Sequence, residues 1–454
     1  MQILGNGWRW ALFLALIFAG RTVAMAGQDE AARVDGQADE QILLMREGGW
    51  CWYQDPRALI QNGKLLVGGV SGVNGDVKVS VYDLEAGQDL GVVVLHPRFQ
   101  ADDHNVPAFY ARPDGSVLAM YAKHGNEPLH YYRISDTADY TQWGEEQVFD
   151  HGRWDPATGV TYMNLHYLSA EKRLYGFFRD GRTFNPFFIT STDHGRTWDE
   201  RTHFIADEVD GRHRPYPRYT RKGPDAVGFC FTEAHPRDFG TSIYYAEYRD
   251  GHFSRASGEP IKDLVKDGPL LTSEADVVFL GSGEGGRGGL LSARESAWTC
   301  AIATDAEGRP HLGYTLYKSN SDNRFRMAFW DGERWVDREV AYAGKCLYER
   351  ESSYTGLMAL DPARPTSVYI SSDVDPFTGK DSGGPHEIYH AEVGPQDDIS
   401  TIDWTPITTG SSERNLRPML VVGGGYKVLL WLHGPWSTYT DYRSDAVGRV
   451  LERP

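Results

Sequence analysis

The sequence has few cysteines and too few basic residues to balance its acidic ones. Four cysteines are spread over 454 residues with no CxxC spacing, so neither a dense disulfide framework nor a zinc ribbon is indicated. Buried free thiols are the favoured interpretation of Cys51, Cys230, Cys300 and Cys346. An exported protein can form a disulfide, and the sequence does not choose among the three possible connectivities. Lys and Arg number 46 against 63 Asp and Glu, which gives a net charge of −17. This acidity argues against DNA or RNA as a partner, because phosphate binding requires a basic face.

Long apolar runs are also missing after residue 20. The one such run, at 10–20, follows Arg9 and is too short to span a bilayer. The Ala-Met-Ala at 24–26 then provides a small-x-small cleavage pattern. Residues 1–26 are therefore predicted to be a signal peptide cleaved after Ala26, with a retained anchor as the alternative. The mature chain is expected to be secreted or periplasmic, monomeric and without a membrane partner.

Amphipathic helices are hard to find, and the composition favours strands. Fifty glycines and an aromatic content of 13% suit short strands broken by tight turns. Asn-Gly and Asp-Gly turn signals recur at 62, 74, 114, 250 and 331. Many short strands predict an all-β sandwich, barrel or propeller. The expected strands are Lys64–Val70, Val77–Tyr82, Ser116–Tyr121, Leu174–Phe178, Phe187–Thr190, Ala226–Phe231, Ser242–Tyr248, Ser367–Ile370 and Lys427–Leu432.

Two hairpin motifs favour the propeller. Residues 191–198 read STDHGRTW, an Asp-box in which the Asp ties the turn backbone and the Trp packs between blades. Residues 329–335, FWDGERW, are a degenerate version of it. At roughly 50–60 residues per four-stranded blade, residues 27–454 predict a single domain, a seven-bladed β-propeller. No Pro/Ser-rich linker divides the chain.

The strongest signal for chemistry is DDHNVPA at 102–108, followed by YAKH at 121–124. An Asp-Gly turn at 114–115 makes this segment a hairpin, with His104 before its first strand and His124 after its second. Both imidazoles can therefore lie at one end of the blade. Such a pair can transfer protons, because His titrates near neutral pH, or it can be half of a metal site. Two ordinary polar residues at a blade edge are the alternative.

Tyr162 and Arg179 belong to the next pair of predicted strands, 159–164 and 174–179. The two side chains are expected near each other, beside the histidine pair. Arg can bind a carboxylate through two parallel hydrogen bonds. A Tyr whose pKa is lowered by a nearby charge can pass a proton. A structural Tyr and an Arg in a surface ion pair are the alternative.

Several of these segments occur in an order that resembles one known family. It is the BNR-repeat propeller family that contains the ulvan lyases of polysaccharide lyase families 24 and 25, and the resemblance covers nearly the whole chain after residue 26. It implies a seven-bladed propeller with a lyase site of two His, one Tyr and one Arg, here His104, His124, Tyr162 and Arg179. The segments are GWCWYQDPR (49–57), DDHNVPA (102–108), RPDG (112–115), YAKH (121–124), TYMN (161–164), YGFFR (175–179), STDHGRTW (191–198), RPY (214–216) and FTEAHPR (231–237).

The resemblance implies β-elimination at a 4-linked uronate, in which the C5 proton is removed and the sugar oxygen on C4 leaves. Arg179, helped by His124, is expected to neutralise the uronate carboxylate. His104 and Tyr162 share the base and acid roles in an undecided order. Further substrate contacts are expected from Asn105, Arg214, Tyr216 and Arg218. No organic cofactor is expected, but family members carry a structural zinc, for which the predicted ligands are His235, Cys300 and His311.

An acidic rhamnose–uronate polysaccharide such as ulvan is the expected partner. Relatives that hydrolyse rhamnose–glucuronate linkages use a His in the first-blade motif, where this chain has Gln54. Gln cannot act as a general base, so the lyase is favoured. A rhamnose–glucuronate lyase acting on plant arabinogalactan and a non-catalytic carbohydrate-binding propeller are the alternatives. A sialidase is disfavoured because the opening strand lacks Arg-Ile-Pro.

Overall fold

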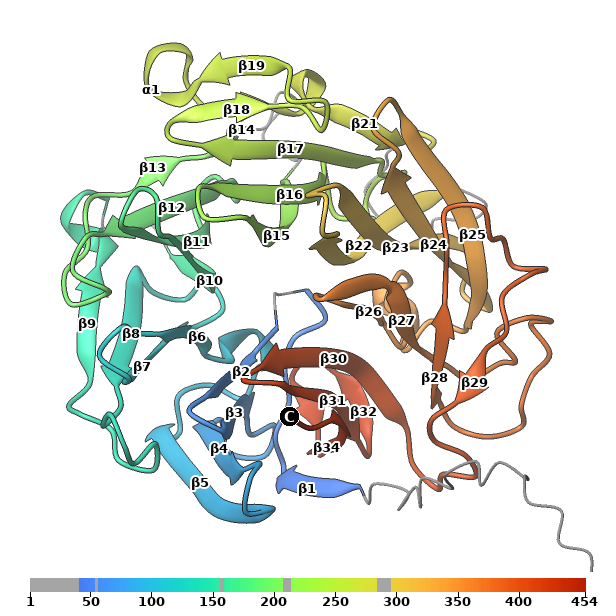
Figure 1. The fold of residues 1–454 in the computed structure, drawn as a ribbon, viewed down its shortest axis with the longest axis horizontal. Helices are drawn as coiled ribbons and strands as arrows, with labels where there is room; N and C mark the ends of the chain where they lie inside the picture. Colours follow the sequence, from blue (N-terminus) through green and yellow to red (C-terminus); the bar gives the residue numbers. More distant parts are fainter. Residues whose placement is uncertain (1–40, 54–55, 156–158, 207–213, 284–294) are drawn as a thin grey trace, which may run out of the picture. The chain divides into compact units, whose positions relative to one another are not determined.

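The computed structural model describes residues 41–53, 56–155, 159–206, 214–283 and 295–454. These residues form seven β-sheet blades around a common axis (Figure 1). The predicted all-β, seven-bladed propeller is confirmed. The predicted signal peptide and Gln54 lie outside the described residues, so both remain predictions.

Each blade is an antiparallel sheet whose innermost strand adjoins the innermost strands of the neighbouring blades. In the first three blades the strands run from the axis to the rim in chain order. Blade 1 contains β2 (Ala58–Gln61), β3 (Lys64–Val70), β4 (Val77–Asp83) and β5 (Gln88–His96). Blade 2 contains β6 (Ala108–Ala111), β7 (Val117–Ala122), β8 (Leu129–Ile134) and β9 (Gln147–Asp150). Blade 3 contains β10 (Val160–Leu168), β11 (Arg173–Asp180), β12 (Pro186–Ser191) and β13 (Thr202–His203).

Blade 4 is enlarged to six strands, and blades 5 and 6 have four each. Blade 4 contains β15 (Tyr216–Lys222), β16 (Ala226–Thr232), β17 (Ile243–Arg249), β18 (His252–Ser254), β19 (Pro260–Asp263) and β21 (Asp276–Phe279). Blade 5 contains β22 (Ser296–Thr304), β23 (Pro310–Ser319), β24 (Asp322–Trp330) and β25 (Trp335–Gly344). Blade 6 contains β26 (Met358–Asp361), β27 (Arg364–Ser372), β28 (Glu387–Glu392) and β29 (Thr405–Pro406).

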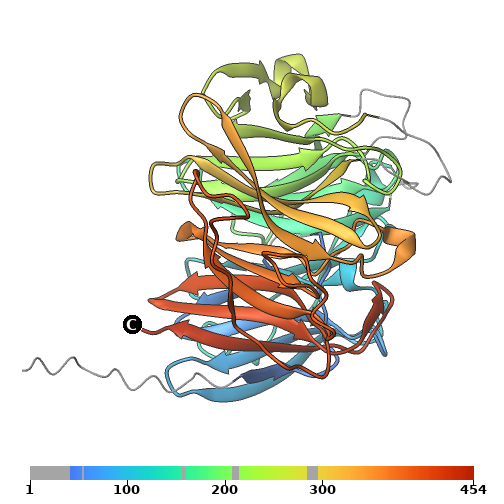
Figure 2. The ribbon, with the colours of Figure 1, turned by 90° about the vertical axis from the view of Figure 1, so that its right-hand side faces the viewer.

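Blade 7 closes the ring with strands from both ends of the described chain. Its inner strands come from the C-terminal part, and its outermost strand, β1, comes from the N-terminal part (Figure 1). Hydrogen bonds between β1 and β34 thus join the start of the propeller to its end. Figure 2 shows the same ring seen from the side. The strands of this blade are β30 (Asn415–Gly423), β31 (Tyr426–His433), β34 (Asp445–Glu452) and β1 (Ile42–Met45).

The remaining elements are short. Two two-stranded sheets pair β14 (Ile205–Ala206) with β20 (Leu270–Leu271), and β32 (Trp436–Thr438) with β33 (Asp441–Tyr442). The helical segments are α1 (Leu264–Asp267) and the 3₁₀ helices η1 (Asp103–Asn105), η2 (His151–Arg153), η3 (Thr272–Glu274) and η4 (Glu349–Glu351). Among the described residues, no helix has the length and apolar character needed to cross a bilayer.

Apolar side chains fill the space between neighbouring blades. The cluster between blades 2 and 3, for example, joins Leu118 of β7 to Val160 of β10 and Leu174 of β11. Each of the nine predicted strands overlaps an observed one. The four cysteines are free, and only Cys346 is not fully buried.

The predicted Asp-box is present at the turn after β12. The Asp193 carboxylate accepts hydrogen bonds from the backbone N–H groups of Arg196 and Thr197, at 3.0 and 2.9 Å. Trp198 packs against the cluster between blades 2 and 3. The hairpin between β24 and β25 uses Asp331 in the same way, as its degenerate sequence indicated. In both turns the carboxylate supplies the hydrogen bonds that the chain reversal leaves unmade.

Closure of the ring by β1 can be tested with two neighbouring leucines. Leu44 is 2% exposed and packs in the main core, whereas Leu43 is 38% exposed. Leu44→Ala is expected to lower the free energy of unfolding by about 2–5 kcal/mol, the usual cost of truncating a buried Leu. Leu43→Ala should cost about 0.5 kcal/mol or less. Urea denaturation measures both, and equal losses would contradict a closing role for β1.

Candidate functional site

Four predicted site residues meet where the inner strands of blades 2 and 3 begin. His104 lies in η1 just before β6, and His124 follows β7. Tyr162 lies near the start of β10, and Arg179 lies near the end of β11. Because neighbouring strands are antiparallel, the start of one strand and the end of the next share an edge. The sequence prediction that these side chains lie together agrees with this geometry.

Asp102 holds the two histidines together, and the sequence reasoning did not single it out. One carboxylate oxygen lies 2.6 Å from Nδ1 of His104, and the other lies 2.9 Å from Nδ1 of His124. The two imidazoles are stacked with their centroids 3.9 Å apart and their planes 16° apart. Asp102 precedes His104 by two residues, and its position in the DDHN block was the available signal.

Local backbone structure fixes this arrangement. Asp102 is the N-cap of η1, and its side chain accepts a hydrogen bond from the backbone N–H of His104 at 3.0 Å. Asn105 is buried and donates through Nδ2 to the backbone and side-chain oxygens of Gln100, both at 3.1 Å. The Gln100 side chain in turn accepts from the backbone N–H of His124 at 3.0 Å. Asn105, predicted to bind substrate, therefore makes contacts that position His124.

Electrostatics make the two stacked rings different. Burial opposes a charge on His104, but its acidic neighbours, Cys51 and Asp102 first, outweigh burial and raise its pKa well above the usual value. Burial and the nearby charge of His104 lower the pKa of His124 to about 4. His124 is also the more accessible ring, with a side chain 24% exposed against 5% for His104. At neutral pH the pair therefore consists of a charged, buried His104 and a neutral His124.

Tyr162 projects from an irregular part of β10. Tyr162 and Met163 stand opposite the single residue Phe178 in the β10–β11 pairing, which is a β-bulge. The φ of Tyr162 is +67°, in the left-handed region that non-glycine residues rarely occupy. Its ring lies 5.6 Å from the His104 ring, centroid to centroid. Burial raises the pKa of Tyr162, so its phenol is protonated at neutral pH.

Arg179 is a buried cation without an anionic partner among the described residues. Its guanidinium lies over the rings of Tyr162, Tyr216 and Phe184, at 5.0, 5.6 and 5.6 Å from their centroids. It donates one hydrogen bond, from Nη1 to the hydroxyl of Tyr216 at 3.3 Å, and its Nε has no partner. No carboxylate of the described residues forms an ion pair with it. Since buried charges are normally paired, this site is suited to an anionic ligand.

The other predicted substrate-binding residues divide into two groups. Tyr216 contacts Arg179 directly, and Arg214 lies on the same ring of Phe184, 5.1 Å from its centroid. Arg218 instead donates to the backbone oxygen of Trp52 at 2.5 Å and lines the central cavity. Tyr216 and Arg214 thus belong to the site, whereas Arg218 holds the chain beneath it.

The three predicted zinc ligands do not converge, so the residues present do not fit that site. Cys300 and His311 lie on neighbouring strands, but the register pairs His311 with Ala303, three residues beyond Cys300. His235 lies after β16, where its Nε2 is 3.3 Å from Glu351. Strand register, which spacing along the sequence does not reveal, separates these residues.

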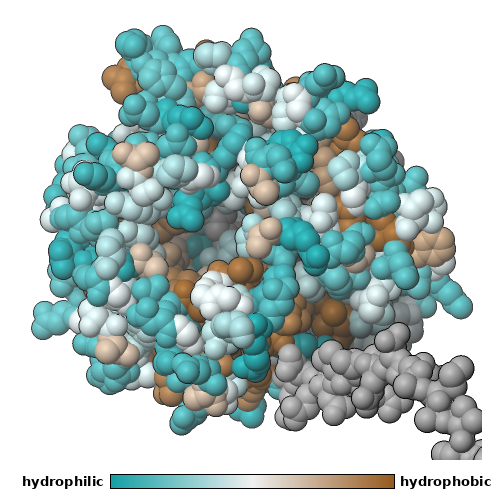
Figure 3. All heavy atoms as spheres, in the orientation of Figure 1, coloured by the Kyte–Doolittle hydropathy of each residue, from teal (hydrophilic) through white to brown (hydrophobic). Residues whose placement is uncertain are grey.

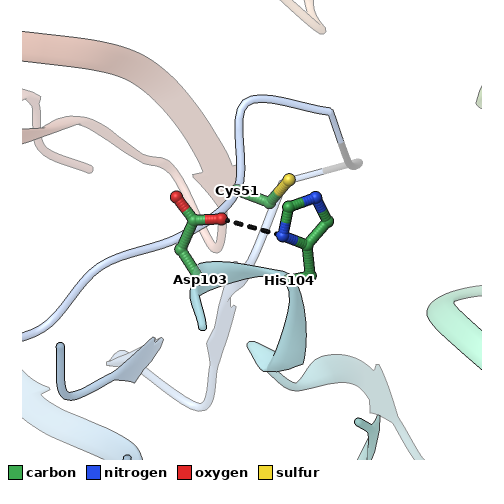
Figure 4. A group of neighbouring side chains, drawn as sticks. All are labelled: Cys51, Asp103 and His104. Atoms are coloured by element: carbon green, nitrogen blue, oxygen red, sulfur yellow. Dashed lines mark ion pairs between the residues drawn. The ribbon is translucent and has the colours of Figure 1, made fainter. Parts of the chain in front are cut away.

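Two other groups of potential metal ligands occur among the described residues, and both contain His104. One is Cys51 with Asp103 and His104, which Figure 4 shows side by side, and the other is Asp102 with both histidines. In each group the donor atoms lie within 4.8 Å of one another. In the first, the Asp103 carboxylate also pairs with buried Arg417 at 2.6 Å. Hydrogen bonds and this ion pair already satisfy most of these donors, so we assign no metal to the site.

The site lies on a face of the ring, outside its central cavity. The middle sections of the inner strands enclose a cavity of about 630 Å³, and Figure 3 looks down the axis onto the hollow centre. Around Tyr162 and Arg179 the hollow measures only about 10 Å³. The cavity contains none of the four clustered residues. The four clustered residues therefore lie at the strand ends and not in the central cavity.

Comparison with known proteins places the chain in a family and gives its fold relatives. Residues 69–343 match the model of a BNR repeat-containing family member. An ulvan lyase of polysaccharide lyase family PL25, solved with bound -[GlcA(1-4)Rha3S]-, is similar with a TM-score of 0.60 and 16% identity, over 91% of this chain and 98% of the other. Polysaccharide lyase Uly1 gives 0.58 and 12%, over 91% and 99%. No curated protein sequence matches the chain.

The role of Asp102 can be tested by removing its charge. Asp102→Asn keeps the size of the side chain, while burial continues to oppose a charge on His104. The pKa of His104 is therefore expected to fall toward or below its usual value, as measured by NMR titration of the ring resonances. Asp114→Asn, on the turn of the same hairpin, is the matched control and should leave that pKa unchanged. A His104 pKa that is the same in wild type and Asp102→Asn would rule out the shared carboxylate as its cause.

Proposed function

This chain belongs to the BNR repeat-containing family, and we propose that it is a polysaccharide lyase that cleaves rhamnose-(1→4)-uronate linkages by β-elimination, with ulvan as its substrate. The observation that carries the proposal is Arg179, a buried cation that has no carboxylate partner in the described part of the chain and lies beside a titratable histidine pair. A uronate supplies the missing carboxylate. The solved ulvan lyase with a bound glucuronate–rhamnose sulfate supports this choice of substrate.

Arg179 and His104 act on the substrate carboxylate. The C5 proton of a uronate is weakly acidic because its removal adds negative charge next to a carboxylate. A guanidinium on the carboxylate stabilises the enolate-like intermediate, and burial strengthens this effect. The charge on His104, next to Tyr162, adds to the positive field of Arg179.

His124 is the base in this proposal. A neutral imidazole has one donor and one acceptor nitrogen. Nδ1 of His124 donates to Asp102 at 2.9 Å, which leaves Nε2 with the lone pair that accepts the C5 proton. The electrostatics thus favour His124 as base, whereas the sequence alone had suggested His104 or Tyr162.

Tyr162 is the acid. Its raised pKa keeps the phenol protonated, so it can donate to the sugar oxygen that leaves C4 as the C4–C5 double bond forms. The reaction then leaves a proton on His124 and removes one from Tyr162, and exchange with water restores both. Apart from water, the proton transfers need no group outside the chain and its substrate.

One assay tests the function. The protein is incubated with ulvan, gum arabic and chondroitin, and the unsaturated uronate is followed by its ultraviolet absorbance while free rhamnose is measured separately. Unsaturated product from ulvan is the expected result. If only gum arabic gives this product, the substrate is plant arabinogalactan instead of ulvan. Free rhamnose without unsaturated product would overturn the lyase assignment. If no polymer gives any product, the protein is a non-catalytic carbohydrate-binding propeller.

The base assignment predicts the acid side of the pH profile. His124 must be neutral to accept a proton, and its pKa is about 4, so activity should persist at pH 5 and fall as pH drops through about 4. His124→Ala should lower kcat by about 10²-fold or more, the usual contribution of a general base. His252→Ala, which changes an exposed His on β18, is the control. An acid limb near the ordinary His pKa of about 6.5 would contradict a neutral His124.

The carboxylate clamp predicts a difference between two arginines on the same segment. Arg179→Lys keeps the charge but loses the planar pair of donors, so kcat/KM should fall by about 10²-fold, or about 2.7 kcal/mol. Arg182→Lys, three residues away and mostly exposed, should change it less than about twofold. Steady-state kinetics on ulvan measures both. Near-normal rates with Lys at 179 would show that only its charge matters.

A further inference from the structure

Two buried histidines behind the site, His130 and His151, are used by none of the steps above. We propose that they form a relay that holds the backbone of Tyr162 in its left-handed conformation and so directs its phenol toward the substrate. They are positioning residues, since neither contacts the reacting atoms. This inference rests on the proposed function, because it concerns the residue assigned there as the acid.

The relay runs from blade 2 to the bulge of blade 3. Nδ1 of His130, on β8, lies 2.9 Å from Nε2 of His151, in η2. Nε2 of His130 lies 3.0 Å from the backbone oxygen of Tyr162. Both histidine side chains are fully buried. The backbone of Tyr162 is thus tied to the neighbouring blade at the residue with the unusual φ.

The hydrogen-bond partners fix the tautomer of both rings. A carbonyl oxygen only accepts, so Nε2 of His130 must carry the hydrogen. In a neutral ring Nδ1 of His130 is then an acceptor, and Nε2 of His151 must donate to it. Nδ1 of His151 is left as an acceptor, and it is a buried atom with no partner among the residues that the structure describes. The chain of donors therefore has one direction, from His151 through His130 to Tyr162.

The surroundings keep both rings neutral, as this chain of donors requires. Burial lowers the pKa of His130 to about 4, and burial together with His130 lowers that of His151 to about 2. Phe178 lies against both rings, at 5.2 and 4.7 Å between centroids, and it is the residue opposite the bulge. An apolar setting of this kind strengthens a hydrogen bond that is made and penalises one that is lost.

Arg57 holds the other side of the same bulge. Its guanidinium donates to the backbone oxygen of Met163 and, at 2.6 Å, to the side-chain oxygen of Asn164. Adjacent peptide oxygens of the bulge, on Tyr162 and Met163, are therefore bonded to different blades. A non-glycine residue keeps a left-handed conformation only where its surroundings over-determine it. His130 supplies the contact that acts on Tyr162 itself.

Two substitutions of His130 separate its two hydrogen bonds. The amide nitrogen of His130→Gln reaches the position of Nε2 and can still donate to the Tyr162 oxygen. The shorter side chain of His130→Asn reaches only the position of Nδ1, where it can accept from His151. We expect His130→Gln to keep kcat within about threefold, and His130→Asn to lose about 10-fold or more, because small misplacements of a proton donor are costly. KM on ulvan should stay unchanged in both, since Arg179 is untouched.

A spectroscopic measurement tests the inference without any activity. The protein is labelled with 3-fluorotyrosine, and the ¹⁹F resonance of Tyr162 is identified by its loss in Tyr162→Phe. It should shift in His130→Asn and stay in place in His130→Gln. If His130→Asn does not fold, His151→Phe replaces it, because loss of the donor to His130 removes the tautomer constraint and should also shift the resonance.

The outcomes separate this inference from the proposed function. If wild type forms no unsaturated uronate from any polymer, the function fails, and the ¹⁹F comparison still decides the relay. If wild type is active but the Gln and Asn variants have equal kcat and the same ¹⁹F spectrum, the relay is overturned and the function stands. A loss that appears in KM instead of kcat would also overturn it, because the relay would then act on substrate binding.

Discussion

A single carboxylate, Asp102, is the constraint on which the site depends. Its two oxygens each hold one imidazole, and together the rings stack at 3.9 Å. One buried negative charge can balance only one buried positive charge, so the pair carries a single positive charge near neutral pH. His104 carries it because its acidic neighbours outweigh the burial that opposes a charge on its ring. His124 is therefore the neutral and more accessible ring. The proposed base, His124, is thus a different residue from the charged groups, His104 and Arg179.

Buried arginines hold the segments that lead into the site. Arg57, Arg218 and Arg417 are almost fully inaccessible, and each donates to a backbone oxygen of a segment that leads into the site. The carbonyls that accept belong to Met163, Trp52 and Trp50, respectively. The GWCWYQDPR segment that helped to identify the family therefore contributes to the architecture of the site. Different blades are joined through these bonds close to the residues of the candidate site.

Much of the fold could be predicted because propeller strands leave a local signal. Short strand-like runs separated by Asn-Gly or Asp-Gly turns located the strands, and β3 has the predicted bounds of Lys64 and Val70. The hairpin argument also placed His104 and His124 at one end of blade 2, because antiparallel pairing is a near-neighbour property. The three predicted zinc ligands do not converge. Their proximity depended on register and on contacts between blades.

The sequence by itself determined the fold class, the family and the residue types that meet at the site. Only the tertiary structure decided which histidine is charged, because that depends on burial and on a carboxylate both rings share. It also decided that Arg179 has no anionic partner within the ranges that the structure describes, and that His130 is hydrogen-bonded to the backbone of Tyr162. Sequence patterns report interactions between residues near in the chain. The charge state and aim of a side chain depend on neighbours that folding brings from other blades.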